Sequence, residues 1–280
     1  MLEKSKLFEI LREENYWHKS PKFDYIQREQ YLHPLREQLD TKSILVVQGP
    51  RRVGKTVLLK LLIKEIKEEG KIQDVLYINL ENYRLVKFYS LELLETIYEV
   101  YRENINPSGR VVFIIDEIQN IPRFEHFLRT KYDKEEEIKF IITGSNSSLL
   151  SKELASRLTG RTLTFEILPF SFNEFLEYHG VEVKARDYYA LESDRLELKH
   201  FFNDYCAKGA IPEYLDKPSE ERLQEYFESV ILKDIVERHE IRNAKLIKDL
   251  GIYLLSNAGN LASYNSLSKT FNVSINTIKE

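Results

Sequence analysis

The chain has 280 residues, 42% of them hydrophobic, which is enough to bury one large domain or a core with one or two small modules. Its 41 basic and 45 acidic residues give a net charge of −4, which excludes a global positive field for holding nucleic acid or anionic lipid. The single cysteine, Cys206, excludes an intrachain disulfide, and no apolar run approaches the roughly 20 residues of a membrane span. We therefore expect a cytoplasmic protein with no membrane partner.

Residues 1–40 form the first predicted part, a helical lead-in. Polar and apolar positions alternate at helical spacing, and Tyr25, Leu32 and Leu39 lie on one stripe that leads to the first strand. An amphipathic packing helix is the simplest explanation of this pattern. Arg28 stands out because it closely precedes the strand and loop described next.

A phosphate-binding loop is predicted at residues 49–56, whose letters GPRRVGKT fit G-x-x-x-x-G-K-[ST] between an apolar strand and a helix. The glycines allow backbone N–H groups to approach phosphate oxygens. Lys55 offers an ammonium to the β- and γ-phosphates, and Thr56 offers a hydroxyl to Mg²⁺. The alternative is a glycine-containing turn that binds nothing. The predicted nucleotide-binding residues of this loop are Gly49, Pro50, Arg51, Arg52, Val53, Gly54, Lys55, Thr56 and Val57.

Residues 41–170 are predicted to be an α/β core. Near-continuous apolar strands joined by helical crossovers indicate a parallel sheet covered on both faces. Strand patterns lie at 44–47, 75–80, 111–115, 140–143 and 162–168, and helical patterns lie at 56–69, 90–104, 123–132 and 148–158.

Two adjacent carboxylates, Asp116 and Glu117, end the third predicted strand. Such a strand is the expected partner of a phosphate-binding loop, with Asp116 orienting Mg²⁺ and Glu117 polarising a water for attack on the γ-phosphate. A second acid favours hydrolysis over binding alone. A solvent-exposed acidic pair is the alternative explanation.

Polar residues also follow the fourth strand. Asn146, or failing it Ser145, is predicted to contact the γ-phosphate or the attacking water, although a helix cap would explain either residue. Arg157 and Arg161 come before the fifth strand, and one of them, preferably Arg161, is predicted to act as an arginine finger on a neighbouring subunit. Surface ion pairs are the alternative for both.

The pattern becomes helical after Pro169. Residues 171–242 are predicted to be an all-α lid, with helices at 172–178, 196–208 and 220–239. Residues 243–280 contain a helix-turn-helix outline, in which the chain turns near Asn272 and Ser274 caps a second helix. That helix is brief, so we expect a partial helix-turn-helix.

These features together resemble the AAA+ superfamily. The loop GPRRVGKT, the upstream Arg28, and LPFSF at 168–172 before EFL at 174–176 are similar to archaeal and bacterial AAA+ ATPases with a carboxy-terminal winged helix. The resemblance runs from residue 27 to about residue 278. It implies a parallel-sheet P-loop NTPase (AAA+-like) core, with Arg28 near the adenine. It also implies an adenine contact from Pro212, which as plain chemistry is equally a helix-breaking turn.

The leading hypothesis is therefore Mg²⁺-dependent binding and hydrolysis of ATP to ADP, with nucleotide controlling the angle between core and lid. The other hypothesis is an ATP-gated binding switch for DNA or a protein, in which hydrolysis is incidental. Acidic net charge gives DNA only weak support as a partner. An arginine finger requires a homo-oligomer or another protein partner.

Overall fold

The computed structural model describes residues 2–21, 25–134, 137–144, 157–181, 192–237 and 241–279. The chain divides into two compact units, Met1–Asp216 and Lys217–Glu280. The first unit holds a parallel sheet, and the second is helical. The predicted lid at 171–242 is thus shared between the two units, and the predicted division into four parts stays a prediction.

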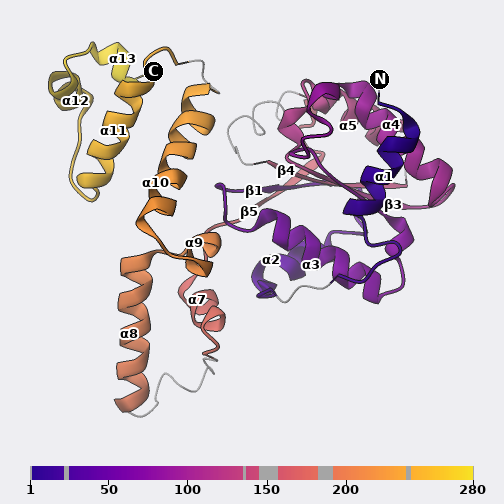
Figure 1. Cartoon of the computed structure of the whole chain (residues 1–280), viewed down its shortest axis with the longest axis horizontal. Helices are drawn as coiled ribbons and strands as arrows, with labels where there is room; N and C mark the ends of the chain where they lie inside the picture. The colour runs from indigo at the N-terminus through magenta and orange to yellow at the C-terminus, as the bar shows by residue number, and fades with distance from the viewer. Residues whose placement is uncertain are drawn as a thin grey trace. The chain divides into compact units, whose positions relative to one another are not determined.

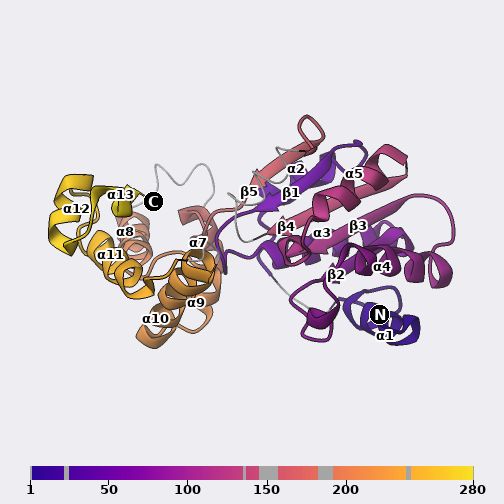
Figure 2. The same ribbon diagram turned by 90° about the horizontal axis from the view of Figure 1, so that it is seen from above.

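The core is a sheet of five parallel strands in the order β2-β3-β4-β1-β5 (Figures 1 and 2; the second labels all five). This order confirms the predicted α/β, P-loop NTPase class. Because the strands are parallel, the carboxyl ends of β1, β3 and β4 meet at one edge of the sheet. The strands are β1 (Ile44–Gln48), β2 (Val75–Asn79), β3 (Val111–Asp116), β4 (Ile138–Gly144) and β5 (Thr162–Glu166).

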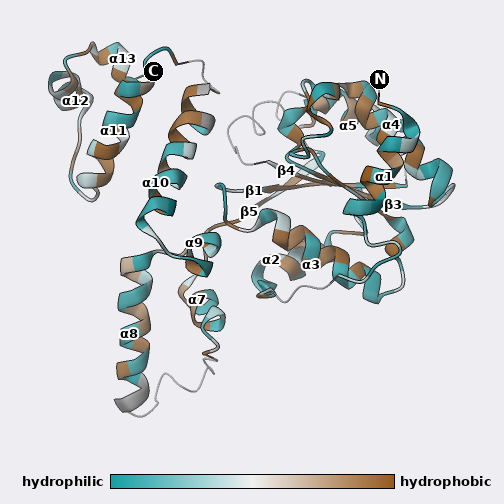
Figure 3. Ribbon diagram, in the orientation of Figure 1, coloured by the Kyte–Doolittle hydropathy of each residue, from teal (hydrophilic) through white to brown (hydrophobic). Residues whose placement is uncertain are grey.

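Helices cover both faces of the sheet, as the two views in Figures 1 and 2 show. Helices α2 (Glu29–Glu37) and α3 (Lys55–Glu68) pack on one face, and α1 (Lys4–Glu14), α4 (Leu91–Asn104) and α5 (Phe124–Lys134) pack on the other. Alternate strand residues feed the two cores, so Leu45 and Val47 face α3 while Ile44 and Val46 face the opposite side. Figure 3 shows the apolar colouring gathered between helices and sheet. Short 3₁₀ turns are Ile72–Asp74, Val86–Phe88 and Ile118–Asn120.

The edge of the sheet at β2 is closed by the residues that follow α1. Asn15 donates its amide to the carbonyl of Tyr77 and accepts from the N–H of the same residue, both at 2.8 Å. The indole of Trp17 donates to the carbonyl of Val75 at 2.7 Å. These side chains occupy backbone groups that a further strand would otherwise bind, so the amino-terminal segment protects this edge from pairing.

In the described part of the first unit, three helices follow β5. They are α7 (Phe172–Tyr178), α8 (Glu192–Lys208) and α9 (Pro212–Asp216). The rings of Phe172 and Phe175 lie 5.6 Å and 5.4 Å from that of Tyr205, which fastens α7 to α8. The N–H of Phe170 donates to the carbonyl of Ala210 at 2.8 Å, so the turn before α9 lies against the exit of β5.

The second unit contains α10 (Glu220–Ser229), a π-helical stretch (Val230–Glu237), α11 (Ala244–Ser256), α12 (Tyr264–Phe271) and α13 (Ile275–Lys279). Where one helix was expected at 220–239, the structure has an α-helix that widens into a π-helix. Asn272 ends α12 in the left-handed conformation at φ 51°, and the hydroxyl of Ser274 accepts from the N–H of Thr277 at 3.1 Å. Two helices, α12 and α13, are thus joined by a turn where the sequence predicted one, and the helical character of this region is confirmed. The partial helix-turn-helix and the winged helix stay predictions.

Candidate functional site

The predicted phosphate-binding loop lies at the carboxyl end of β1, where Gly49 has no room for a side chain. A Cβ on Gly49 would lie 2.2 Å from the carbonyl oxygen of Ile167, because the chain that leaves β5 passes close to the start of the loop. Arg52 and Gly54 adopt left-handed backbone conformations, at φ 64° and 94°. Helix α3 begins at Lys55, and the first-turn N–H groups of a helix are a favourable place for an anion.

Lys55 is buried beneath this loop, with its side chain 5% exposed. Its ammonium donates to the carbonyls of Gly49 and Pro50, both at 3.0 Å, and lies 3.9 Å from a carboxylate oxygen of Glu117. Lys55 of the loop and Glu117, the acid that follows β3, therefore lie close together.

Asp116 is fully buried at the end of β3 and accepts three hydrogen bonds from hydroxyls. Oδ2 accepts from Thr56 at 2.7 Å and from Tyr77 at 3.0 Å, while Oδ1 accepts from Thr143. Burial raises the pKa of Asp116, and the hydrogen bonds from Thr143 and Thr56 oppose that shift. The predicted metal pair, Thr56 and Asp116, is thus in direct contact.

Glu117 has a left-handed backbone, at φ 56°, which is uncommon for a residue other than glycine. Its N–H donates to the hydroxyl of Thr143 at 2.9 Å, and Gln119 donates to its carboxylate. A backbone conformation of this kind persists only where neighbouring contacts enforce it, and such positions gather at functional sites. Here Thr143 and Gln119 are the contacts that hold Glu117.

Two residues of this network, Thr143 and Tyr77, were missing from the predicted site. Thr143 is the polar residue of β4 next to Asp116 in the sheet, and it holds both acids. Tyr77 shares a face of β2 with Asn79, which pairs with Asp116, so its long side chain reaches the carboxylate. A hydroxyl near the end of a strand adjacent to β3 was the sequence signal for both.

Arg28 and Pro212 lie on the lid side of the loop. The guanidinium of Arg28 is buried and donates to the carbonyl of Val53 at 2.7 Å, inside the loop. Pro212 begins α9, and the carboxylate of Glu213 lies 3.5 Å from the guanidinium of Arg52. Both predicted adenine contacts are therefore near the loop, and their contact with adenine stays a prediction.

The two candidate arginine fingers contact α5 of their own chain. Arg161 lies 3.1 Å from the carboxylate of Asp133 and 5.4 Å from the ring centre of Tyr132, and Arg157 lies 3.8 Å from Glu125. The carbonyl of Arg161 accepts from the N–H of Ile44, which places it at the amino ends of the strands, away from the loop. Asn146 and Ser145, the predicted γ-phosphate contacts, lie outside the described residues.

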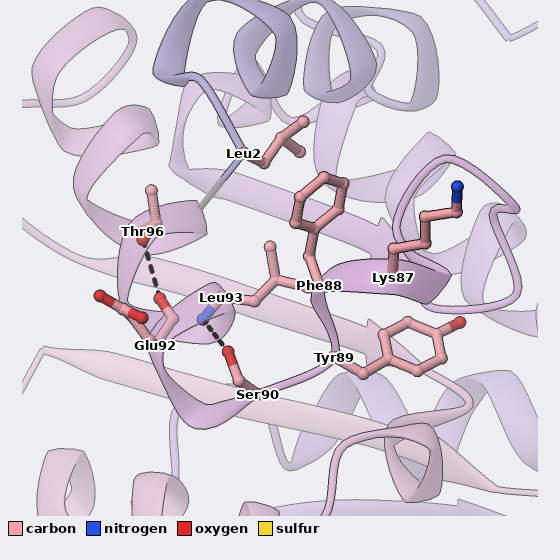
Figure 4. Close-up of a pocket in the computed structure, with 8 residues that line it drawn as sticks. All are labelled: Leu2, Lys87, Phe88, Tyr89, Ser90, Glu92, Leu93 and Thr96. Carbon is pink, nitrogen blue, oxygen red and sulfur yellow. Dashed lines mark hydrogen bonds between the residues drawn. The ribbon is translucent and has the colours of Figure 1, made fainter.

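A small pocket of about 230 Å³ lies apart from these residues, between the amino terminus and the start of α4 (Figure 4). Ser90 caps α4 there by accepting from the N–H of Leu93 at 3.2 Å. None of the predicted site residues lines it. Across the described residues, no helix is both long and apolar enough to span a membrane.

Comparison with known families agrees with this geometry. Residues 41–176 match the model of the family AAA_14, described as an AAA domain. The sheet and the loop described above thus lie in a segment that is similar to an AAA domain. Residues 199–280 match a second family model, DUF8612, described as a domain of unknown function.

Two uncharacterized proteins are among those with a similar sequence. One is MJ1544 of Methanocaldococcus jannaschii, 35% identical over 85% of this chain and 53% of its own length. The other, from Haemophilus influenzae, is 31% identical over 88% of this chain and 59% of its own length. The chain thus spans little more than half of the curated relatives that it matches.

Two solved structures are also similar. ORC1 of Aeropyrum pernix, in complex with DNA, has a TM-score of 0.45 at 16% identity, covering 92% of this chain and 82% of that one. AMPPCP-bound DnaA of Aquifex aeolicus has a TM-score of 0.36 at 17% identity, covering 92% and 87%. Scores of this size do not place the chain with either protein.

Proposed function

We propose that this chain binds ATP with Mg²⁺ and hydrolyses it, and that the cycle changes the arrangement of core and lid. The observation that supports this most directly is the contact of loop and strand: Thr56 bonds Asp116 at 2.7 Å, and Lys55 lies 3.9 Å from Glu117. A glycine-containing turn that binds no ligand would not explain why Lys55, Asp116 and Glu117 lie together at the loop.

The donor set fits magnesium, which takes oxygen ligands from a hydroxyl and a carboxylate beside phosphate oxygens. Thr56 and Asp116 supply such a pair, and Tyr77 and Thr143 fix the carboxylate from both of its oxygens. When bound, the metal neutralises charge on the β- and γ-phosphates.

In the proposed reaction, Lys55 exchanges its bonds with Gly49 and Pro50 for phosphate oxygens. Glu117 accepts a proton from a water whose oxygen attacks the γ-phosphorus, the bond to the bridging oxygen breaks, and ADP and inorganic phosphate result. Thr143 accepts a hydrogen bond from the N–H of Glu117 and Gln119 donates one to its carboxylate, so these two residues position the acid.

Coupling to the lid is proposed through Arg52. This loop arginine lies 3.5 Å from Glu213 of α9, so a triphosphate in the loop competes with Glu213 for the same guanidinium. The turn that contains Pro212 then moves with the occupancy of the loop, and we propose that Pro212 contacts the adenine, with Arg28 beside it.

The test is phosphate release from ATP, measured with nucleotide binding, for the wild type, Lys55→Ala and Glu117→Gln. Lys55→Ala should lose binding, whereas Glu117→Gln should bind ATP but fail to hydrolyse it. Lys64→Ala, on the same helix, is the matched control and should behave as the wild type. Undiminished turnover in both site variants would remove the assignment.

The arginine finger requires a second copy of the chain. Arg161 precedes β5, whose five residues run parallel to β1, so a strand length of roughly 13 Å or more separates it from its own loop. Only a neighbour's nucleotide is within reach, and we propose a nucleotide-dependent homo-oligomer. Mass in solution with and without ATP tests this; a monomer that hydrolyses ATP would remove the role of Arg157 and Arg161.

A nucleotide-gated switch is the second candidate, favoured by the α12–α13 turn. Lys279 lies over the ring of Tyr264 at 5.9 Å and, with Lys269, gives a thin basic face. Binding of duplex DNA that falls steeply with salt and depends on ATP, in a variant unable to hydrolyse it, would favour the switch.

A further inference from the structure

One buried guanidinium connects three parts of the first unit that are far apart in sequence. Arg28 donates from Nε to Glu174 Oε1 at 2.6 Å, from Nη2 to Glu174 Oε2 at 3.3 Å and to the carbonyl of Leu168 at 2.9 Å, and from Nη1 to the carbonyl of Val53 at 2.7 Å. The side chains of Arg28 and Glu174 are 3% and 7% exposed. The ion pair is therefore almost completely removed from water.

The surroundings hold this arginine in one position. Its guanidinium carbon lies 4.7 Å from the ring centre of Tyr31 and 5.1 Å from that of Phe170. Its backbone is left-handed, at φ 51°, which carries a conformational cost and persists because the surrounding contacts determine it. Replacing a buried ion pair by two well-packed apolar residues often leaves folding stability unchanged or raises it. A buried charge on a strained backbone therefore indicates that Arg28 does more than stabilise the fold.

Glu174 has a second task at the start of α7. Its Oε2 accepts from the N–H of Ser171 at 2.8 Å and from the hydroxyl of Ser171 at 3.0 Å, which completes a capping box. Although burial acts to raise it, the pKa of Glu174 is lowered by the hydrogen bonds from Arg28 and Ser171. The carboxylate therefore joins the first turn of α7 to the guanidinium.

The contact with Val53 bears on phosphate binding. In a planar trans peptide the carbonyl and the following N–H point in opposite directions. By holding the carbonyl of Val53, Arg28 turns the N–H of Gly54 away from itself. Gly54 is the second glycine of the loop and the residue before α3, where backbone N–H groups are presented to an anion.

We propose that Arg28 and Glu174 form a positioning pair that orients the Gly54 amide for phosphate and transmits nucleotide occupancy from the loop to α7. This rests on the proposed function, since it requires that the loop bind nucleotide. It gives Arg28 a role that needs no contact with adenine.

The pair can be separated from its structural side effects by two substitutions. Glu174→Gln removes the charge and retains a side chain that completes a capping box, because glutamine serves at that position as glutamate does. Arg28→Lys retains a positive charge but cannot reach Val53, Leu168 and both oxygens of Glu174 together. Glu177→Gln, on the exposed side of the same helix, is the matched control.

Three quantities are measured for each variant: affinity for a non-hydrolysable ATP analogue, the unfolding midpoint, and hydrogen exchange of amides 168–178 with and without the analogue. We expect Arg28→Lys to weaken affinity about tenfold or more, the factor for one lost hydrogen bond to a charged group. Glu174→Gln should weaken affinity less and abolish the nucleotide-dependent change in exchange, which the wild type and Glu177→Gln should both show. The double variant should bind like Arg28→Lys alone, because the two residues act as a unit.

Two results would overturn the proposal. One is a lowered unfolding midpoint in either variant with unchanged affinity and an unchanged exchange response, since that is the behaviour of a merely structural pair. The other is a wild type that binds the analogue without any response at 168–178. A wild type that does not bind the analogue at all would instead refute the proposed function, and the positioning pair with it.

Discussion

Replacing Thr143 by valine should disable the site while leaving its shape almost unchanged. Thr143 is fully buried, donates its hydroxyl to Asp116 and accepts the N–H of Glu117 at 2.9 Å. Valine has the same shape but can neither donate nor accept. Its substitution removes one hydrogen bond to a carboxylate and leaves one buried N–H without an acceptor.

The magnitude follows from these two losses. A hydrogen bond to a charged group contributes about 1.5–3 kcal/mol, and a buried donor without an acceptor costs about 1–3 kcal/mol. The additional buried methyl group of valine offsets somewhat under about 1 kcal/mol of this loss. The expected net loss of unfolding free energy is about 2–4 kcal/mol. Thr143→Ser keeps the hydroxyl and loses one buried methyl group, so it should lose only about 1 kcal/mol.

Urea unfolding followed by tryptophan fluorescence is a suitable assay, because Trp17 is the one tryptophan of the chain and lies buried in the first unit, 5.8 Å from the ring of Tyr101. It reports on the unit that contains Thr143 without interference from residues 217–280. Phosphate release measures the second effect: Thr143→Val should hydrolyse ATP at least about tenfold more slowly, since Glu117 loses its anchor. Equal stability of the valine and serine variants would refute the reasoning.

Three further predictions follow from contacts elsewhere in the first unit. Gly49→Ala should unfold at markedly lower urea than the wild type, because its Cβ meets the carbonyl of Ile167 at 2.2 Å; a normal midpoint would show that the loop relaxes freely. Asn15→Ala should lose about 2–4 kcal/mol by circular dichroism, since it strands the N–H and carbonyl of Tyr77, and a loss under 1 kcal/mol would mean that water replaces the amide. Burial lowers the pKa of Lys139 from 10.5 to about 8, so between these two pH values the unfolded chain binds more protons than the folded one. The free energy of unfolding of the wild type should therefore rise with pH relative to that of Lys139→Met. A difference between the two proteins that stays constant with pH would contradict this.

Local pattern was sufficient for the elements that position the site. Strands β1 to β4 are short, mainly apolar runs, and the loop at 49–56 is specified by its own letters, so Lys55, Thr56, Asp116 and Glu117 could be placed before any contact was known. The parallel order then follows because the crossovers are helical, which brings the carboxyl ends of β1, β3 and β4 to one edge.

Pairings between distant segments could not be predicted in the same way. Arg28 and Glu174 are 146 residues apart, and nothing in either local sequence indicates that one serves the other. Tyr77 reads as an ordinary strand aromatic until the sheet register puts its hydroxyl 3.0 Å from Asp116. Thr143, inside β4, contacts both acids. The prediction for this strand named Asn146, or failing it Ser145, and both lie outside the described residues, so it stays a prediction.

The same contacts determine what nucleotide binding has to exchange. In the proposed nucleotide complex, Lys55 would give up two carbonyls at 3.0 Å and Thr56 would share its hydroxyl between Asp116 and Mg²⁺, so part of each new interaction would replace an existing one. The Val53 carbonyl, in contrast, keeps Arg28 as its partner, and the Gly54 amide is oriented beforehand. Net affinity in such a site comes mainly from groups that need not rearrange, which are the loop amides and the first turn of α3. For that reason Arg28→Lys should reduce the affinity for nucleotide, although residue 28 contacts no phosphate.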